Sequence, residues 1–143
     1  MRDARDALMV ARNTDGKLVR RPLSPHVLSY RWPLSGLLSG THRITGLALG
    51  VGTLLMTWWL VAAAASDSAF AAVQWFLSSW LGILCLCGWT LALFQHLFSG
   101  IRHLAWNAVY GFDKAEYRAT NWAVIAASAA CTVVTLIVGF VVW

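Results

Sequence analysis

The sequence lacks charge over most of its length. Only 12% of its 143 residues are Asp, Glu, Lys or Arg, whereas 59% are hydrophobic. No Lys or Arg occurs between Arg43 and Arg102, and none follows Arg118. Soluble domains usually carry about 25% charged residues. The composition therefore excludes an ordinary soluble domain and favours a single membrane domain.

Cysteine is scarce, and patterns that bind flavin or nucleotide are absent. The three cysteines, Cys85, Cys87 and Cys131, lie in apolar runs. The CxC pair has no second pair at metal-ligand spacing, so we expect the thiols to pack as small apolar side chains. Without such a pattern, we expect no catalytic residue in this chain.

The basic residues gather in two places. Most precede the first long apolar run, and Arg102, Lys114 and Arg118 lie between the second and third runs. The positive-inside rule places both groups in the cytoplasm, so the net charge of +5 does not indicate nucleic-acid binding. Asp3 and Asp6 argue against a transit peptide. This favours the bacterial inner membrane, with multiple crossings, over the mitochondrial inner membrane.

Three apolar segments are long enough to span a bilayer as helices. The spans are expected at about residues 37–65, 73–100 and 122–143. We expect a short outer turn at 66–69, an interfacial stretch through Trp75 and Trp80, and an inner connection at 101–121. The prediction is an all-α membrane protein with a cytoplasmic N-terminus and an outer C-terminus, forming part of a helical-bundle anchor with a second chain.

Residues 1–30 are polar and are expected to form an extended cytoplasmic arm, ahead of a transmembrane domain in residues 31–143. The arm either touches anionic headgroups or docks a soluble partner, and composition leaves both roles open. His26 lies on this arm, where a surface position is expected.

Small residues four apart in the first span permit a close neighbour. They form the pairs Gly36/Gly40 and Gly46/Gly50. A second helix of this chain, a partner chain or a flat ligand would fit equally well. Trp89 falls in the middle of the second span, where a partner chain is one candidate neighbour.

The segment from Thr90 to Asn107 carries the strongest functional signal. His96, Gly100 and His103 are spaced four and three apart, so they share one face of a helix. The two imidazoles lie roughly 10 Å apart along the axis. An ionisable side chain inside a membrane span is a candidate functional residue. Apolar neighbours cannot satisfy His96, so we expect its partner to come from a cofactor or another subunit.

The predicted topology brings a second polar group to the same leaflet. Ser39, His42 and Arg43 share a face at the start of the first span. Haem iron needs an axial imidazole at membrane depth, and His96 is the deepest histidine. Gly100 would let a flat ring approach.

Two kinds of ligand, haem and quinone, would need hydrogen-bond donors near the inner membrane boundary. Haem propionates are anionic, and the available donors are His42, Arg43, Arg102 and His103. A quinone carbonyl would find donors in Ser39 and Arg43.

Simpler interpretations remain open. His96 could bond a neighbouring helix without any cofactor, in a purely structural anchor or assembly subunit. Arg43 and Arg102 could snorkel to the interface, and Ser39 could pack. A self-contained carrier with two haems would need four histidines at membrane depth, and only His96 is well placed.

Three motifs resemble one known family. They are RPLSPH (Arg21 to His26), followed by SYRW, then SGTHRITG (Ser39 to Gly46) and HLFSGIRHLAWN (His96 to Asn107). Their order and the expected spans resemble the cytochrome b556 membrane-anchor family of succinate dehydrogenase (respiratory complex II). The resemblance covers most of the chain from Arg21 onward.

The resemblance implies a complex with a flavoprotein, an iron–sulfur subunit and a second small anchor. The flavoprotein would oxidise succinate, and electrons would pass through iron–sulfur centres to quinone at the inner face. This chain would be a non-catalytic subunit of an oxidoreductase that shares haem b with a histidine of the second anchor.

The resemblance also implies roles for individual residues. His96 matches the axial haem ligand, and Ser39 and Arg43 match a quinone-site serine and arginine. His42 matches a residue near a haem propionate, and Arg102 with His103 matches a pair at the haem edge. Asn107 stands where the family often has aspartate, so no carboxylate role is expected there.

Overall fold

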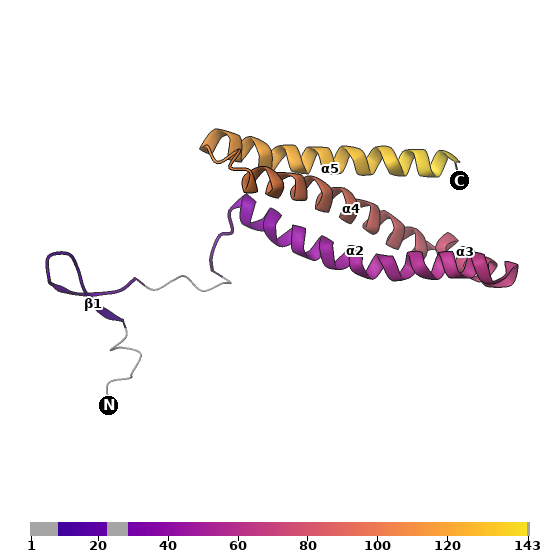
Figure 1. Cartoon of the computed structure of the whole chain (residues 1–143), viewed down its shortest axis with the longest axis horizontal. Helices are drawn as coiled ribbons and strands as arrows, with labels where there is room; N and C mark the ends of the chain where they lie inside the picture. Colours follow the sequence, from indigo (N-terminus) through magenta and orange to yellow (C-terminus); the bar gives the residue numbers. More distant parts are fainter. Residues whose placement is uncertain (1–8, 23–28, 143) are drawn as a thin grey trace, which may run out of the picture. The chain divides into compact units, whose positions relative to one another are not determined.

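The computed structural model describes residues 9–22 and 29–142. The chain divides into two compact units, Met1–Trp32 and Pro33–Trp143. The first contains a small β-hairpin, and the second consists of helices (Figure 1).

The first unit holds two short antiparallel strands, β1 (Val10–Arg12) and β2 (Leu18–Arg20). The Asn13 side-chain oxygen accepts the backbone N–H of Lys17 at 2.9 Å, and Gly16 adopts a φ of 77° that favours glycine. The expectation of an extended arm is wrong for this stretch. The sequence Asn-Thr-Asp-Gly between the strands is typical of a hairpin turn. The prediction relied on the polar composition of the arm and did not use this turn sequence.

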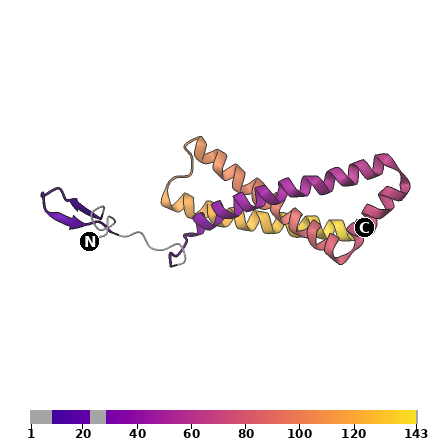
Figure 2. The same cartoon turned by 90° about the horizontal axis from the view of Figure 1, so that it is seen from below.

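Three long helices make up most of the second unit. They are α2 (Leu34–Ala65), α4 (Trp80–Asn107) and α5 (Lys114–Val142). Each is long and apolar enough to cross a membrane. Helix α4 packs against both α2 and α5 and lies between them in Figure 1, and Figure 2 shows the three helices crossing one another. The predicted all-α membrane architecture is therefore confirmed.

A separate helix, α3 (Asp67–Ser78), follows α2. The expected second span, at residues 73–100, is divided at Ser79, whose backbone is extended. Ser66 caps α3 and Ser79 caps α4, because each hydroxyl oxygen accepts a backbone N–H, at 3.2 and 3.1 Å. The hydropathy of the sequence does not predict the corner between α3 and α4, because apolar residues lie on both sides of Ser79.

Gly82 allows the corner between α3 and α4 to close. A Cβ at this position would lie 2.2 Å from the carbonyl oxygen of Phe76 and 2.6 Å from the Cα of Leu77. Both are backbone atoms, which cannot move aside as a flexible side chain can. Gly82 is therefore a steric requirement of this corner.

We expect Gly82→Ala to destabilise the helical unit by about 3 kcal/mol through overpacking. The measurement is the thermal unfolding midpoint of the purified complex in detergent. Gly88→Ala is the matched control in the same helix, because a Cβ at Gly88 meets nothing within 4 Å. Equal midpoints for the two variants would show that the corner tolerates a side chain.

The connection between α4 and α5 is shorter than the sequence suggested. The expected loop at 101–121 is largely helical, because α4 continues to Asn107 and α5 begins at Lys114. The backbone N–H of Tyr117 bonds the Asp113 carbonyl at 2.8 Å in the first turn of α5. Charged residues excluded this stretch from the predicted span, but the end of a membrane helix can carry charge into the interface.

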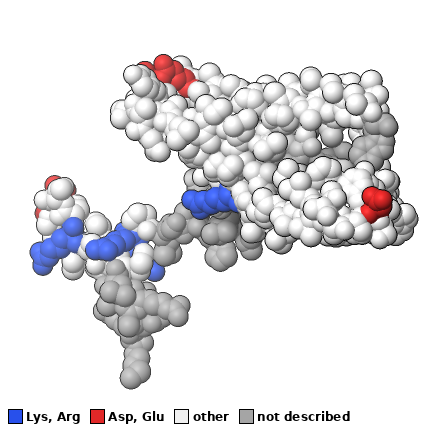
Figure 3. Space-filling view, turned by 45° about the vertical axis from the view of Figure 1, so that its right-hand side comes forward, with Lys and Arg blue, Asp and Glu red and all other residues white. Residues whose placement is uncertain are grey.

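Little of the apolar surface is buried within the chain. The core cluster of Ala62, Val73 and Leu77 lies where α3 packs on α2, whereas most large apolar residues of the long helices are exposed. Figure 3 shows the helical unit almost free of charged atoms over the face in view. These faces therefore require lipid or partner helices.

Candidate functional site

Helices α2 and α4 bring three imidazoles together. The rings of His42 and His96 are stacked, with centroids 4.0 Å apart and planes inclined by 8°. The ring of His103 lies 5.0 Å from that of His42. His96 and His103 therefore do share one face of α4, as their spacing predicted, and His42 contacts both.

The ring that lies beside Gly100 is that of His42. A Cβ at Gly100 would lie 3.6 Å from Cε1 of His42. The flat ring that approaches this glycine is therefore an imidazole of the same chain. A distance of 3.6 Å is an ordinary van der Waals contact, so the approach of a flat ligand to Gly100 stays a prediction.

His96 has a polar partner within its own chain. Its Nδ1 lies 3.0 Å from the backbone carbonyl oxygen of His42 and 3.4 Å from Oγ1 of Thr45. The expectation that His96 finds no partner in this chain is therefore wrong for Nδ1. Both contacts use the same nitrogen, and Nε2 has no hydrogen bond to the described residues.

The glycines of α2 differ in what they face. A Cβ at Gly46 would lie 3.0 Å from Cε1 of His96, whereas one at Gly50 would meet nothing within 4 Å. A Cβ at Gly52 would lie 2.1 Å from Nε1 of Trp89. At Gly46 and Gly52, the close neighbour of α2 is therefore α4 of the same chain. Trp89 of α4 packs against α2.

Arg102 points toward α5. Its side chain is only 4% exposed, Nη1 donates to Oδ1 of Asn121, and the guanidinium carbon lies 4.6 Å from the Trp106 ring centroid. The interpretation that Arg102 snorkels to the membrane interface is therefore wrong. Nε and Nη2 are buried without a partner in the described part of the chain.

Residues of α5 that the sequence analysis did not select complete these contacts. Tyr117 donates its hydroxyl hydrogen to Ser35 of α2, and Ser128 donates to the Phe94 carbonyl oxygen at 3.3 Å. Tyr117, Asn121 and Ser128 are spaced four and seven apart, which places them on one face of α5. That periodicity was the available signal for the face that meets the rest of the chain.

Arg43 and Ser39 lie on α2 beside the histidine cluster. The Arg43 side chain is exposed and directly follows His42 along α2. Ser39 is half-buried and lies one turn before Arg43. Neither side chain makes a hydrogen bond to another described residue, so their donors remain available to an external group.

The sequence matches a known membrane-protein family. The family described as "Succinate dehydrogenase/Fumarate reductase transmembrane subunit" matches residues 17–135. The chain belongs to this family. The match includes most of α2 to α5, and therefore the whole histidine cluster, and it confirms the resemblance drawn from the three motifs.

Individual relatives carry consistent names. A "succinate dehydrogenase cytochrome b556 subunit" of Paracoccus denitrificans is 49% identical over 121 residues, covering 85% of this chain and 93% of the relative. The subunit of the same name from Rickettsia felis is 35% identical over 109 residues, covering 76% and 85%. A "succinate dehydrogenase cytochrome b560 subunit" of Reclinomonas americana is 34% identical over 100 residues, covering 66% and 69%.

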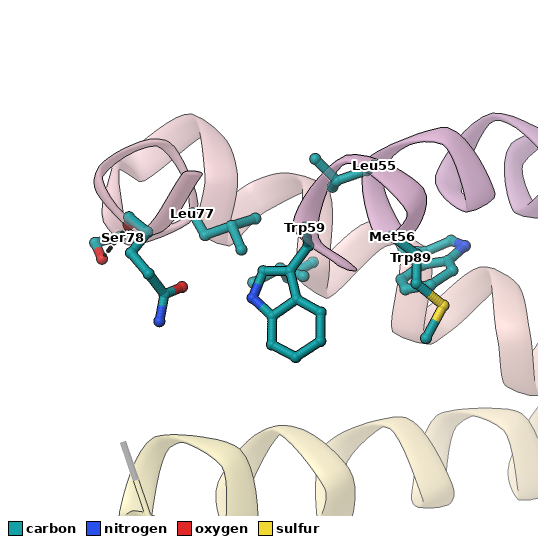
Figure 4. Close-up of a pocket in the computed structure, with 8 residues that line it drawn as sticks. Leu55, Met56, Trp59, Leu77, Ser78 and Trp89 are labelled. Carbon is teal, nitrogen blue, oxygen red and sulfur yellow. Dashed lines mark hydrogen bonds between the residues drawn. The ribbon is translucent and has the colours of Figure 1, made fainter. Parts of the chain in front are cut away.

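A cavity lies apart from the histidine cluster. It measures about 610 Å³ and is formed by α2, α3 and α4 (Figure 4). Its lining is mostly apolar, with Leu55, Met56, Trp59, Gln74, Leu77, Ser78, Leu86 and Trp89. No candidate haem or quinone residue contributes to it, so the polar site is the surface around His42 and His96.

The remaining residues to which the sequence drew attention are the cysteines and His26. The three cysteines are free thiols, and no group of three or more His, Cys, Asp or Glu side chains suited to a metal ion occurs in residues 9–22 and 29–142. His26, with most of the RPLSPH motif, lies outside the described residues.

Proposed function

We propose that this chain is the cytochrome b anchor subunit of a succinate dehydrogenase. It holds haem b together with a second small anchor and helps form the site where quinone receives electrons from the iron–sulfur subunit. The soluble iron–sulfur and flavoprotein subunits lie on the cytoplasmic side of a bacterial inner membrane. The observation that carries the proposal is the bonding of His96 through Nδ1 alone.

The geometry of His96 fits an axial ligand. When Nδ1–H donates to the His42 carbonyl, the neutral imidazole keeps its lone pair on Nε2, which is the form that binds iron. Haem b, when bound, supplies reversible one-electron transfer. His42 bounds one face of the His96 ring, which restricts rotation of the imidazole.

Among the described residues, His96 is the one imidazole bonded in this way, so a second ligand to the haem iron would come from the other anchor. His42 and His103 lie within the same cluster and are therefore assigned to the haem edge, together with Arg43. Arg102 serves this edge less well, because it is buried and bonded to Asn121. Its main role is to hold α4 against α5.

Arg43 and Ser39 are assigned to quinone. A quinone carbonyl accepts hydrogen bonds, and the exposed guanidinium of Arg43 has donors that no described residue uses. The hydroxyl of Ser39, one turn away on the same helix, supplies a neutral donor. Residues of the partner subunits would complete the site.

A pyridine haemochrome assay on the purified complex tests this function. We expect one haem b for each copy of this chain. A value above one would instead favour a carrier with two haems, although only three histidines lie within the described residues. No haem would favour a structural anchor.

A cofactor-free structural anchor is the second candidate function. The observation in its favour is the contact of His96 with His42, since a hydrogen bond and a stacked ring already join α2 to α4. In that case both imidazoles would serve helix packing only. The haem content of the complex separates the two functions.

A further inference from the structure

One turn of α2 forms a cradle around the His96 ring, and we propose that Thr45 and Gly46 are positioning residues for this imidazole. They act on its tautomer and its tilt, and they do not touch iron or quinone. The inference rests on the proposed haem function, and it assigns a role to two residues that the motif comparison left without one.

Thr45 is held by its own helix. Its Oγ1 lies 2.8 Å from the Thr41 carbonyl oxygen and 3.0 Å from the His42 carbonyl oxygen. Threonine on a helix commonly bonds back to the preceding turn, which fixes its side-chain rotamer. The hydroxyl hydrogen is therefore directed at carbonyl oxygens, and a lone pair remains for His96.

This arrangement selects one tautomer of His96. Nδ1 faces two oxygen atoms, the His42 carbonyl at 3.0 Å and Thr45 Oγ1 at 3.4 Å. A carbonyl oxygen can only accept, and the Thr45 hydrogen is already committed to its own helix. The proton of the neutral imidazole is therefore favoured on Nδ1, which leaves Nε2 free to bind iron.

Gly46 sets the position of the ring. A methyl group at this residue would lie 3.0 Å from Cε1 of His96, 3.4 Å from Nδ1 and 3.9 Å from Nε2. The His42 ring is stacked 4.0 Å away on one face of the imidazole, so movement in that direction is blocked. Any side chain at Gly46 would have to tilt the ring, which changes both the Nδ1 contact and the direction of Nε2.

The position and tautomer of the His96 ring should affect the affinity of the chain for haem and the midpoint potential of the haem. A partner that fixes the second nitrogen of a histidine ligand orients the ring and raises its basicity, and loss of such a partner typically costs about 10-fold to 100-fold in affinity. Thr45 and the His42 carbonyl share this role, so loss of Thr45 alone should give an effect near the lower limit.

The first test uses Thr45→Val in the whole purified complex. We expect about a 10-fold faster loss of haem to apomyoglobin, together with a shifted midpoint potential of the haem. Thr45→Ser should restore both values, because serine keeps the hydroxyl. Thr53→Val is the matched control. The exposed Thr53 hydroxyl donates to its own helix, at 2.6 Å to the Gly50 carbonyl oxygen, but unlike Thr45 it has no hydrogen bond to a histidine among the described residues.

The second test compares Gly46→Ala with Gly50→Ala. We expect Gly46→Ala to change the spectrum of the reduced haem and to lower haem retention, and Gly50→Ala to match the wild-type complex, because a Cβ there meets nothing within 4 Å. If Gly46→Ala does not assemble, the Thr45 variants decide the proposal.

The outcomes also separate this inference from the proposed function. A wild-type complex with haem b, in which Thr45→Val matches Thr53→Val in potential and haem retention, would overturn the positioning role alone. A wild-type complex without haem b would overturn the proposed function and this role with it.

Discussion

Replacing His96 by Ala should abolish the haem b absorption band of the dithionite-reduced complex. The substitution removes Nε2, the one nitrogen of this imidazole that the described chain leaves unbonded. An axial ligand cannot be replaced by the apolar neighbours of α4, so the loss should be nearly complete. The measurement is the reduced-minus-oxidised visible spectrum, normalised to the amount of this chain.

The control for His96 is its neighbour Gln95. Its amide donates to Oγ1 of Thr41 at 3.2 Å and thereby also joins α4 to α2, whereas the Nδ1 contacts of His96 are with Thr45 and the His42 carbonyl. Gln95→Ala should keep the haem band, because the loss of one such hydrogen bond costs only about 1 kcal/mol. An unchanged band in His96→Ala would remove His96 from the ligand role.

Arg43→Leu should lower quinone reduction by about 10-fold to 100-fold. A hydrogen bond from a charged donor contributes about 1.5–3 kcal/mol, and each 1.36 kcal/mol corresponds to a factor of ten in rate. Electron transfer to an artificial soluble acceptor should stay largely intact, because the substitution leaves the proposed flavoprotein and iron–sulfur partners unchanged. The measurement is the ratio of the two activities in the same preparation.

The position of Arg43 makes this experiment interpretable. The side chain is exposed and bonds no described residue, so its removal breaks no hydrogen bond within these parts of the chain. Arg43→Lys keeps the charge but loses the forked donor geometry, and an intermediate rate is expected. Ser39→Ala should act in the same direction by about 1 kcal/mol. Loss of both activities in Arg43→Leu would indicate failed assembly and argue against a specific quinone role.

Part of the site was predictable from spacing along one helix. His96 and His103 share a face of α4 because a helix repeats every 3.6 residues, whatever lies around it. The same periodicity placed Ser39, His42 and Arg43 together on α2. These statements needed only the prediction of a helix, which a long uncharged segment makes secure.

The partner of each side chain was not predictable in this way. Arg102 was expected at the membrane interface or the haem edge, but it is buried against Asn121 of α5. From the sequence, Asn121 was expected at the end of the inner connection at 101–121, since charged residues precede it. Thr45 was passed over because a threonine in a membrane helix is an ordinary residue until a ring is found beside it. Gly46 was noted only as one of the small residues that permit a close neighbour.

By itself the sequence determined three membrane helices, their order and the residues of each polar face, because backbone hydrogen bonds inside a helix are local and lipid requires them. Only the tertiary structure decided that His42 stacks on His96, that the Nδ1 of His96 faces α2, and that Arg102 turns to α5. Those contacts join residues 19 to 54 positions apart. They depend on which faces of the helices meet. Packing between helices selects those faces, and the periodicity of a single helix does not predict it.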